Sequence, residues 1–267
     1  MKRSFLWLAA CVLLIPQAMV AQAAAAPAAA GPRWQQIIEV NVKPGMEMVY
    51  ENYVKKIVAA AVKGKGKVSW TTFSVMVGKP GGTYRIVLTF NTWAERDSWG
   101  DVGEMLTKAF GQVEAERLMK EGGGATERSV SEVWENLPAL GTNAGMAAAN
   151  AAPPNFYRVV VTRVGPSSSA AYEALLAKFK PAYDAAANKP VIARSVLRYG
   201  AASGSTYRRS QEFNSMSDLD AQIAAGSPLP AHFGAEWQAM SDELNRVTVT
   251  RQEFISARRA ALSYTAK

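Results

Sequence analysis

TYRIVLTFN, residues 83–91, recurs in altered form as TYRRSQEFN, residues 206–214. Each stretch follows a glycine-rich turn, at 78–82 in the first case and at 200–205 in the second. Tyr207 lies 123 positions after Tyr84, and the pair Phe233-Gly234 lies 123 positions after Phe110-Gly111. Self-similarity at a fixed offset is the signature of a repeated structural unit. The sequence therefore predicts an internal duplication.

The hydrophobic pattern around these stretches predicts the same order of elements twice. Alternating apolar residues indicate strands, and apolar residues three and four positions apart indicate amphipathic helices. The first series is strand 38–42, helix 50–61, strands 68–77 and 83–91, helix 102–121 and strand 129–135. The second is strand 156–164, helix 167–183, strands 191–199 and 206–214, helix 229–244 and strand 247–255. The order β-α-β-β-α-β is that of a ferredoxin-like unit. We expect repeats at 33–136 and 155–259, a linker at 137–154 and a C-terminal tail at 260–267.

The N-terminus has the pattern of a cleaved secretion signal. Lys2 and Arg3 precede an apolar run, and Ala21-Gln22-Ala23 supplies small residues at a cleavage site. We expect a signal peptide over 1–23, a flexible leader over 24–32, and a periplasmic or secreted mature protein. Cys11 leaves lipidation open as an alternative, although its place inside the apolar run favours a signal sequence. No later stretch is apolar enough to span a membrane.

Composition narrows the function classes. The chain has 267 residues, of which 49% are hydrophobic and 19% charged, an ordinary globular balance. Its net charge of +8 comes from dispersed residues rather than basic runs, so we expect no nucleic-acid partner. One histidine and one cysteine, the latter inside the expected signal, exclude multi-histidine and thiolate metal sites. We expect no metal and no cofactor.

The open face of a four-stranded sheet must be covered, so two such units are expected to pack sheet to sheet. With its repeated topology and matched Phe-Gly pairs, the chain resembles the dimeric α/β-barrel superfamily. That superfamily includes antibiotic-biosynthesis monooxygenases, EthD-like and NIPSNAP-like proteins and the haem-binding chlorite dismutases. The resemblance covers residues 33 to about 259 and implies an α+β fold in which two tandem repeats close one intramolecular barrel. The helix faces leave homodimerisation open.

Strand alternation predicts which side chains line the barrel. We expect the helices to contact Phe73, Val75 and Val77, and the barrel interior to contain Trp70, Met76, Arg85, Arg194, Arg198, Arg208 and Glu212. Arg209 and Gln211 replace Ile86 and Leu88 of the first repeat, and a bulge or sheet edge there would invert this assignment.

These residues predict a pocket for a small anionic or aromatic organic molecule, with guanidinium groups as its polar end. An ion-pair network that fixes how the sheets meet is the alternative interpretation of the same side chains. Two further classes stay open: an enzyme, either a cofactor-independent monooxygenase or a haem protein, and a structural module with a filled barrel. The resemblance to chlorite dismutases implies His232 as the axial ligand in the haem case. We assign no catalytic residue.

Overall fold

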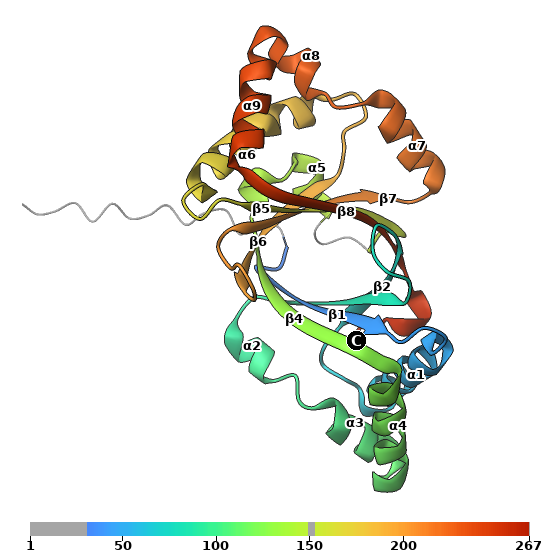
Figure 1. Ribbon diagram of the computed structural model, residues 1–267. Helices are drawn as coiled ribbons and strands as arrows, with labels where there is room; N and C mark the ends of the chain where they lie inside the picture. Colours follow the sequence, from blue (N-terminus) through green and yellow to red (C-terminus); the bar gives the residue numbers. More distant parts are fainter. Residues whose placement is uncertain (1–30, 149–152, 267) are drawn as a thin grey trace, which may run out of the picture.

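The computed structural model describes residues 31–148 and 153–266 (Figure 1). The expected signal peptide and most of the expected leader lie outside the described residues. Within the described ranges, no helix is both long enough and apolar enough to cross a membrane.

The strands of the described residues form one closed antiparallel barrel in the order β1-β3-β2-β8-β5-β7-β6-β4. The first four are β1 (Trp34–Val42), β2 (Trp70–Val77), β3 (Thr83–Phe90) and β4 (Thr126–Asn136). The others are β5 (Phe156–Val164), β6 (Ile192–Tyr199), β7 (Thr206–Phe213) and β8 (Thr248–Arg258). β2 pairs with β8 and β4 pairs with β6, so closure leaves no unpaired sheet edge. The expected α+β barrel is confirmed, whereas the origin of its halves by duplication stays a prediction.

Helices cover the outside of each half of the barrel. The first half carries α1 (Glu47–Gly64), α2 (Trp93–Asp97), α3 (Val102–Phe110) and α4 (Gln112–Ala125). The second half carries α6 (Ser169–Ala185), α7 (Met216–Ala225), α8 (Leu229–Phe233) and α9 (Trp237–Val247), with the short turn η2 (Gly234–Glu236) between the last two. Figure 1 shows the two helix layers on opposite sides of the barrel.

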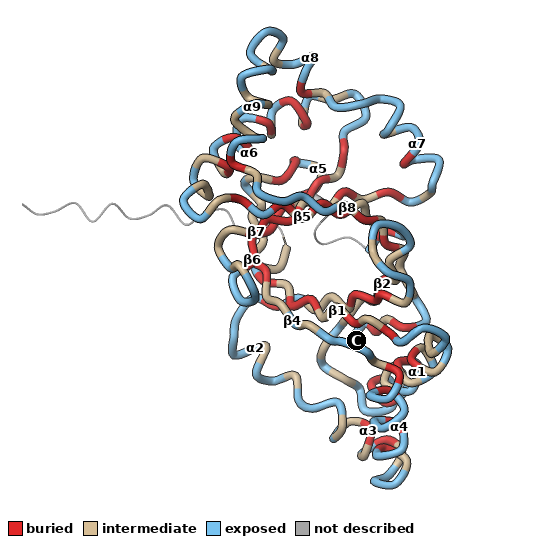
Figure 2. The backbone as a smooth tube through the Cα atoms, viewed as in Figure 1, coloured by how far each residue is buried: buried red, intermediate tan, exposed pale blue. Residues whose placement is uncertain are grey.

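Apolar side chains join each helix layer to its sheet. In the first half, Val40 and Tyr84 on the strands pack against Tyr50 and Val54 of α1. In the second half, Ile192, Val196 and Tyr207 on the strands belong to one apolar cluster with Leu175 and Phe179 of α6. Burying one such large side chain contributes about 1.5–3 kcal/mol. Figure 2 shows the buried residues along the strands and along the helices next to them.

The two Phe-Gly pairs interrupt the helices that contain them. Gly111 has φ 86° and separates α3 from α4, and Gly234 has φ 52° at the end of α8. These backbone angles lie in the left-handed region that favours glycine. The single helices expected over 102–121 and 229–244 are therefore each divided at the glycine.

The expected linker and tail both contain ordered structure. In the linker, η1 (Pro138–Leu140) and α5 (Asn143–Ala148) follow β4, and α5 lies beside β6. In the tail, η3 (Ala260–Leu262) follows β8, and Leu262 is fully buried against the first half. Tyr264 then forms a β-bridge with Trp70.

The expected facing is wrong for β2 and β6 and correct for β3 and β7. Phe73 pairs with Arg85, and residues paired across a ladder share a face, so Phe73 points into the barrel and Trp70 points out. Inside, the ring of Phe73 contacts that of Tyr157. In the second hairpin Arg194 pairs with Arg209 and faces the helices. The prediction placed the pairing of each hairpin one residue from the register in the structure, because the hydrophobic pattern does not fix that register.

Candidate functional site

The structure divides the predicted site between two places. Arg85, Arg208 and Glu212 lie in the barrel interior, as expected, because their ladder partners share the face of the interior apolar residues Val87 and Val161. Arg194 lies on the other side of the second sheet, against the helices.

Three predicted residues lie in neither place, because they belong to the two strands whose facing is inverted or to a bulge. Trp70 packs outside the barrel on Tyr264, with ring centroids 5.1 Å apart. Met76 lies at a register shift between β2 and β8 and is 51% exposed. Arg198 lies on the outer surface, where its Nε donates to Glu135 Oε2 at 2.7 Å.

A cavity of about 540 Å³ lies between the outer face of the second sheet and its helices. Strands β5, β6, β7 and β8 contribute to its floor, and α6, α7, α8 and α9 contribute to its walls. The apolar part of the lining includes Tyr172, Leu176, Phe179, Tyr183, Leu229 and Trp237. Cavities of roughly 300–1,000 Å³ with mostly apolar walls are typical of small-molecule sites.

Arginines supply the charge of this cavity. Arg158, Arg194, Arg209 and Arg251 all contribute to the lining, and no aspartate or glutamate does so among the described residues. Glu253, outside the lining, pairs with Arg158 and Arg251, whereas Arg194 and Arg209 form no ion pair with any described residue. The cavity floor therefore presents two guanidinium groups that form no ion pair among the described residues.

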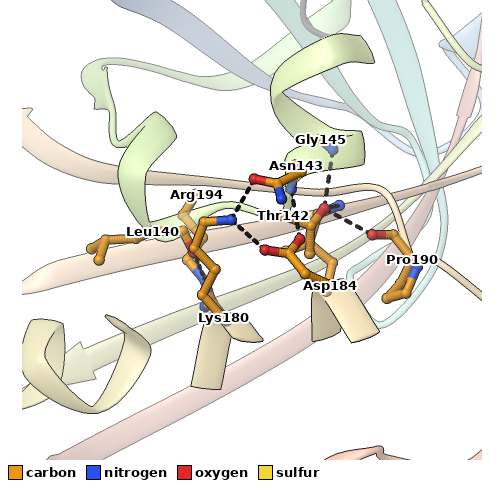
Figure 3. Close-up of polar contacts among 9 residues, drawn as sticks. Leu140, Thr142, Asn143, Gly145, Lys180, Asp184, Pro190 and Arg194 are labelled. Atoms are coloured by element: carbon orange, nitrogen blue, oxygen red, sulfur yellow. Dashed lines mark hydrogen bonds and ion pairs between the residues drawn. The ribbon is translucent and has the colours of Figure 1, made fainter. Parts of the chain in front are cut away.

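The segment before β5 holds Arg194 in place (Figure 3). Arg194 Nε donates to the carbonyl oxygen of Leu140 at 2.9 Å. That segment is fixed in turn by Thr142, whose buried hydroxyl donates to Pro190 O at 2.8 Å and accepts from Gly145 N and Ile192 N at 3.0 Å. The expected linker thus orients a cavity residue.

Arg209 is less tightly held. It lies directly opposite Arg194 in the β6–β7 ladder, and its Nε has no hydrogen-bond partner among the described residues. Burial lowers the pKa of both guanidinium groups. For Arg209, Tyr183 and Glu253 partly offset this effect, whereas Arg158 and Arg251 lower its pKa further. A bound anion would relieve both the desolvation and the repulsion between like charges.

The barrel interior contains a second set of polar groups among large side chains. The guanidinium of Arg208 lies 5.0 Å from the ring centroid of Trp134 and donates through Nη2 to Gln35. That of Arg85 lies 4.8 Å from the ring of Phe254. Burial raises the pKa of Glu212, whose carboxylate accepts a hydrogen bond from the Tyr157 hydroxyl at 3.3 Å.

Sequence reasoning missed Arg209 as a site residue, although the sequence contained the signal. Arg209 and Gln211 stand where the first repeat has Ile86 and Leu88, on a face that should pack against helices. Both residues line the cavity. Two polar residues on a strand face that was expected to be buried therefore indicate where the helices do not pack directly on the sheet.

Comparison with known proteins identifies the fold class. No family model matches the sequence, and no curated protein matches it either. Among solved structures, one described as a "putative monooxygenase" from Lactobacillus acidophilus NCFM is 9% identical, with 88% of this chain and 97% of that chain covered and a TM-score of 0.50. An anthrone oxidase-like protein is 15% identical, with coverages of 87% and 95% and a TM-score of 0.48. A dye-decolorizing peroxidase from Bacteroides thetaiotaomicron is 11% identical, with coverages of 88% and 96% and a TM-score of 0.44.

The likeness to the Lactobacillus acidophilus structure concerns the fold alone, and it agrees with the closed antiparallel α+β barrel of the described residues. Identities this low establish the fold and leave the activity open. No family-model or sequence match points to the NIPSNAP-like or EthD-like proteins.

His232, which the haem alternative would use as its axial ligand, lies outside the helix-side cavity. Its side chain is exposed on α8, where its ring packs edge-on against Phe233. It is not part of the cavity lining, which offers no histidine, cysteine or methionine among the described residues. The usual axial ligands other than tyrosine are therefore missing from this cavity.

Proposed function

We propose that the protein binds a small organic anion with an aromatic or apolar body in the helix-side cavity of its second half. The observation that carries this proposal is the pair Arg194 and Arg209 on the floor of an aromatic cavity with no carboxylate in its described lining. The guanidinium groups would bind the anionic end as charge-assisted hydrogen-bond donors. The rings of Tyr172, Phe179 and Trp237 would cover the rest of the ligand.

We further propose that the two halves arose by duplication and that the protein is exported. The matched offsets of 123 positions and the agreement of strand order between the halves support duplication. The charged start, apolar run and small-residue site of 1–23 support export. Homodimerisation and an oxygenase activity stay predictions, the latter with no residue assigned to it.

A pair of fluorescent probes tests the binding proposal. 1-Anilinonaphthalene-8-sulfonate is aromatic and anionic, and N-phenyl-1-naphthylamine has a similar body without the charge. We expect the sulfonate to bind at a single saturable site, and Arg194→Gln and Arg209→Gln each to weaken its binding about tenfold or more. Binding of the neutral probe should change by less than about twofold.

Arg163→Gln is the matched control, because Arg163 lies on β5 but is exposed and does not line the cavity. Circular dichroism should confirm that all three variants stay folded. If both cavity variants bind the sulfonate as tightly as the wild type does, or if they weaken both probes equally, the proposal of an anion-binding cavity is wrong.

A further inference from the structure

Three polar atoms inside the barrel have no hydrogen-bond partner among the described residues. They are Nε of Arg85, Nε of Arg208 and Oγ of Ser195. The three residues are only 7%, 5% and 1% exposed. Buried polar groups in native proteins nearly always have partners, so three such atoms on the inner face of one barrel require an explanation.

The two arginines come from corresponding places in the two halves. Arg85 on β3 and Arg208 on β7 each follow a tyrosine that packs on the helix layer. Ser195 is the ladder partner of Arg208 on β6. Both arginines are on the inner face of the barrel, and burial and then the charge of Arg85 lower the pKa of Arg208 to about 9.

Among the described residues, Glu39 is the one carboxylate that forms an ion pair with either arginine, and Lys79 shares it. Arg85 Nε lies 3.7 Å from Glu39 Oε2, beyond hydrogen-bond distance, while Lys79 Nζ donates to Glu39 Oε1 at 2.6 Å. In the second half, Val161 stands opposite Arg208, where the first half has Glu39 opposite Arg85.

Glu132 is a second carboxylate whose charge raises the pKa of both arginines. It accepts a hydrogen bond from Trp134 Nε1 at 3.2 Å and forms no ion pair with either arginine. Arg85 itself donates no side-chain hydrogen bond to any described residue. Its Nε therefore has an ion-pair partner in Glu39 but no acceptor within hydrogen-bond distance among the described residues.

We propose that the barrel interior between Arg85 and Arg208, with Ser195 beside them, is a second binding site, for a small oxyanion. A carboxylate or a sulfate-like group would accept hydrogen bonds from both guanidinium groups and from the Ser195 hydroxyl. Its negative charge would offset the repulsion between the two arginines. This site lies on the opposite face of the second sheet from Arg194 and Arg209, so it does not depend on the helix-side cavity.

Calorimetric titration with sodium sulfate, in a buffer without other oxyanions and at constant ionic strength, tests the site. We expect one saturable site in the wild-type protein, and about tenfold or greater weakening in Arg85→Gln and in Arg208→Gln. Arg246→Gln is the control, because Arg246 is an exposed residue of α9 that pairs with Glu243, and it should bind sulfate like the wild type. A parallel titration with sodium acetate distinguishes a carboxylate site from a site for tetrahedral oxyanions.

Crystals of the wild-type protein soaked in selenate provide a test that needs no variant. The expected result is an anomalous peak between the guanidinium groups of Arg85 and Arg208. The proposal is overturned if the wild type binds neither sulfate nor acetate saturably, if both variants retain full binding, or if selenate binds only elsewhere. In those cases the arginines serve only to join the two halves of the barrel.

Discussion

Arg209 and Gln211 are the differences between the two halves that matter most for the proposed binding site. In the first half, Ile86 and Leu88 on the corresponding face read as ordinary core residues of a sheet covered by helices. In the second half, the same face carries a guanidinium and an amide, and Gln211 donates to Gln222 of α7 at 2.9 Å. Such a face cannot be packed dry without cost, because desolvating an unpaired charge is unfavourable. In the structure this face lines a cavity instead of packing against helices.

Exchanging these two residues for their first-half counterparts tests this account. Arg209→Ile combined with Gln211→Leu should weaken binding of 1-anilinonaphthalene-8-sulfonate about tenfold or more, because a charged donor is lost. The same variant should raise the free energy of unfolding by about 1–2 kcal/mol, because apolar groups replace a desolvated charge. Urea denaturation measures the second effect. A variant that is less stable than the wild type and binds the probe normally would contradict both expectations.

Arg208 gives the barrel site a pH dependence with a defined sign. The pKa of Arg208, about 9 because of burial and then of Arg85, means that its positive charge is lost as pH rises through 9. Tyr157 and Glu132 raise this pKa and are the other titratable groups in its field. Sulfate keeps its charge throughout, so its affinity should be constant from pH 7 to 8 and fall by up to about tenfold per pH unit above 9. Calorimetry at stepped pH values measures it, and unchanged binding at pH 10.5 would exclude Arg208 from the site.

At the scale of elements, the sequence could predict the strands and their order but not how each hairpin faces. A period of two residues places the side chains of a strand in two sets, and it does not say which set points inward. For β3 and β7 the inward face was predicted correctly, because the apolar set includes Tyr84 and Tyr207, which pack on the helices. For β2 both faces are buried in part, since Thr72 bonds to the C-terminal segment and Phe73 lies inside the barrel. Only the pairing register, which depends on turn geometry, separates the two sets.

The segment after β4 could not be predicted as an ordered element, because its alanine, glycine and proline content is that of a linker. Gly145 shows why it packs closely: a Cβ there would lie 2.2 Å from the carbonyl oxygen of Ile192. We expect Gly145→Ala to lower the free energy of unfolding by about 1–3 kcal/mol, because the backbone of β6 must move.

Gly124→Ala is the control for this prediction. Gly124 lies in α4, and nothing lies within 4 Å of the position that its Cβ would occupy. Its replacement should leave stability unchanged or raise it by up to about 1 kcal/mol, since alanine favours helix. Thermal denaturation of both variants gives the comparison, and equal stabilities would show that α5 does not need close contact with β6.

At the scale of the whole molecule, each half depends on the other. Separated halves would expose the inner face of a sheet and leave β2, β4, β6 and β8 each without one partner strand. We expect fragments 31–148 and 153–267 to aggregate or to form mixed oligomers when produced alone, and to form a soluble 1:1 complex when produced together. Size-exclusion chromatography with light scattering distinguishes these outcomes. A monomeric, folded fragment would show that one half is an independent domain.

The joint between β2 and the end of the chain also determines when folding can finish. Thr72 donates its hydroxyl hydrogen to the carbonyl oxygen of Leu262, 190 residues away, and Trp70 bonds to the same carbonyl. During synthesis, all residues of the first half are therefore made before β8, so one edge of β2 stays unpaired until β8 has been synthesised. Contacts this distant in sequence slow folding and prolong exposure of unpaired edges. The nascent chain consequently cannot close its barrel until Leu262 has been synthesised, and until then the open edge of β2 can pair with another molecule.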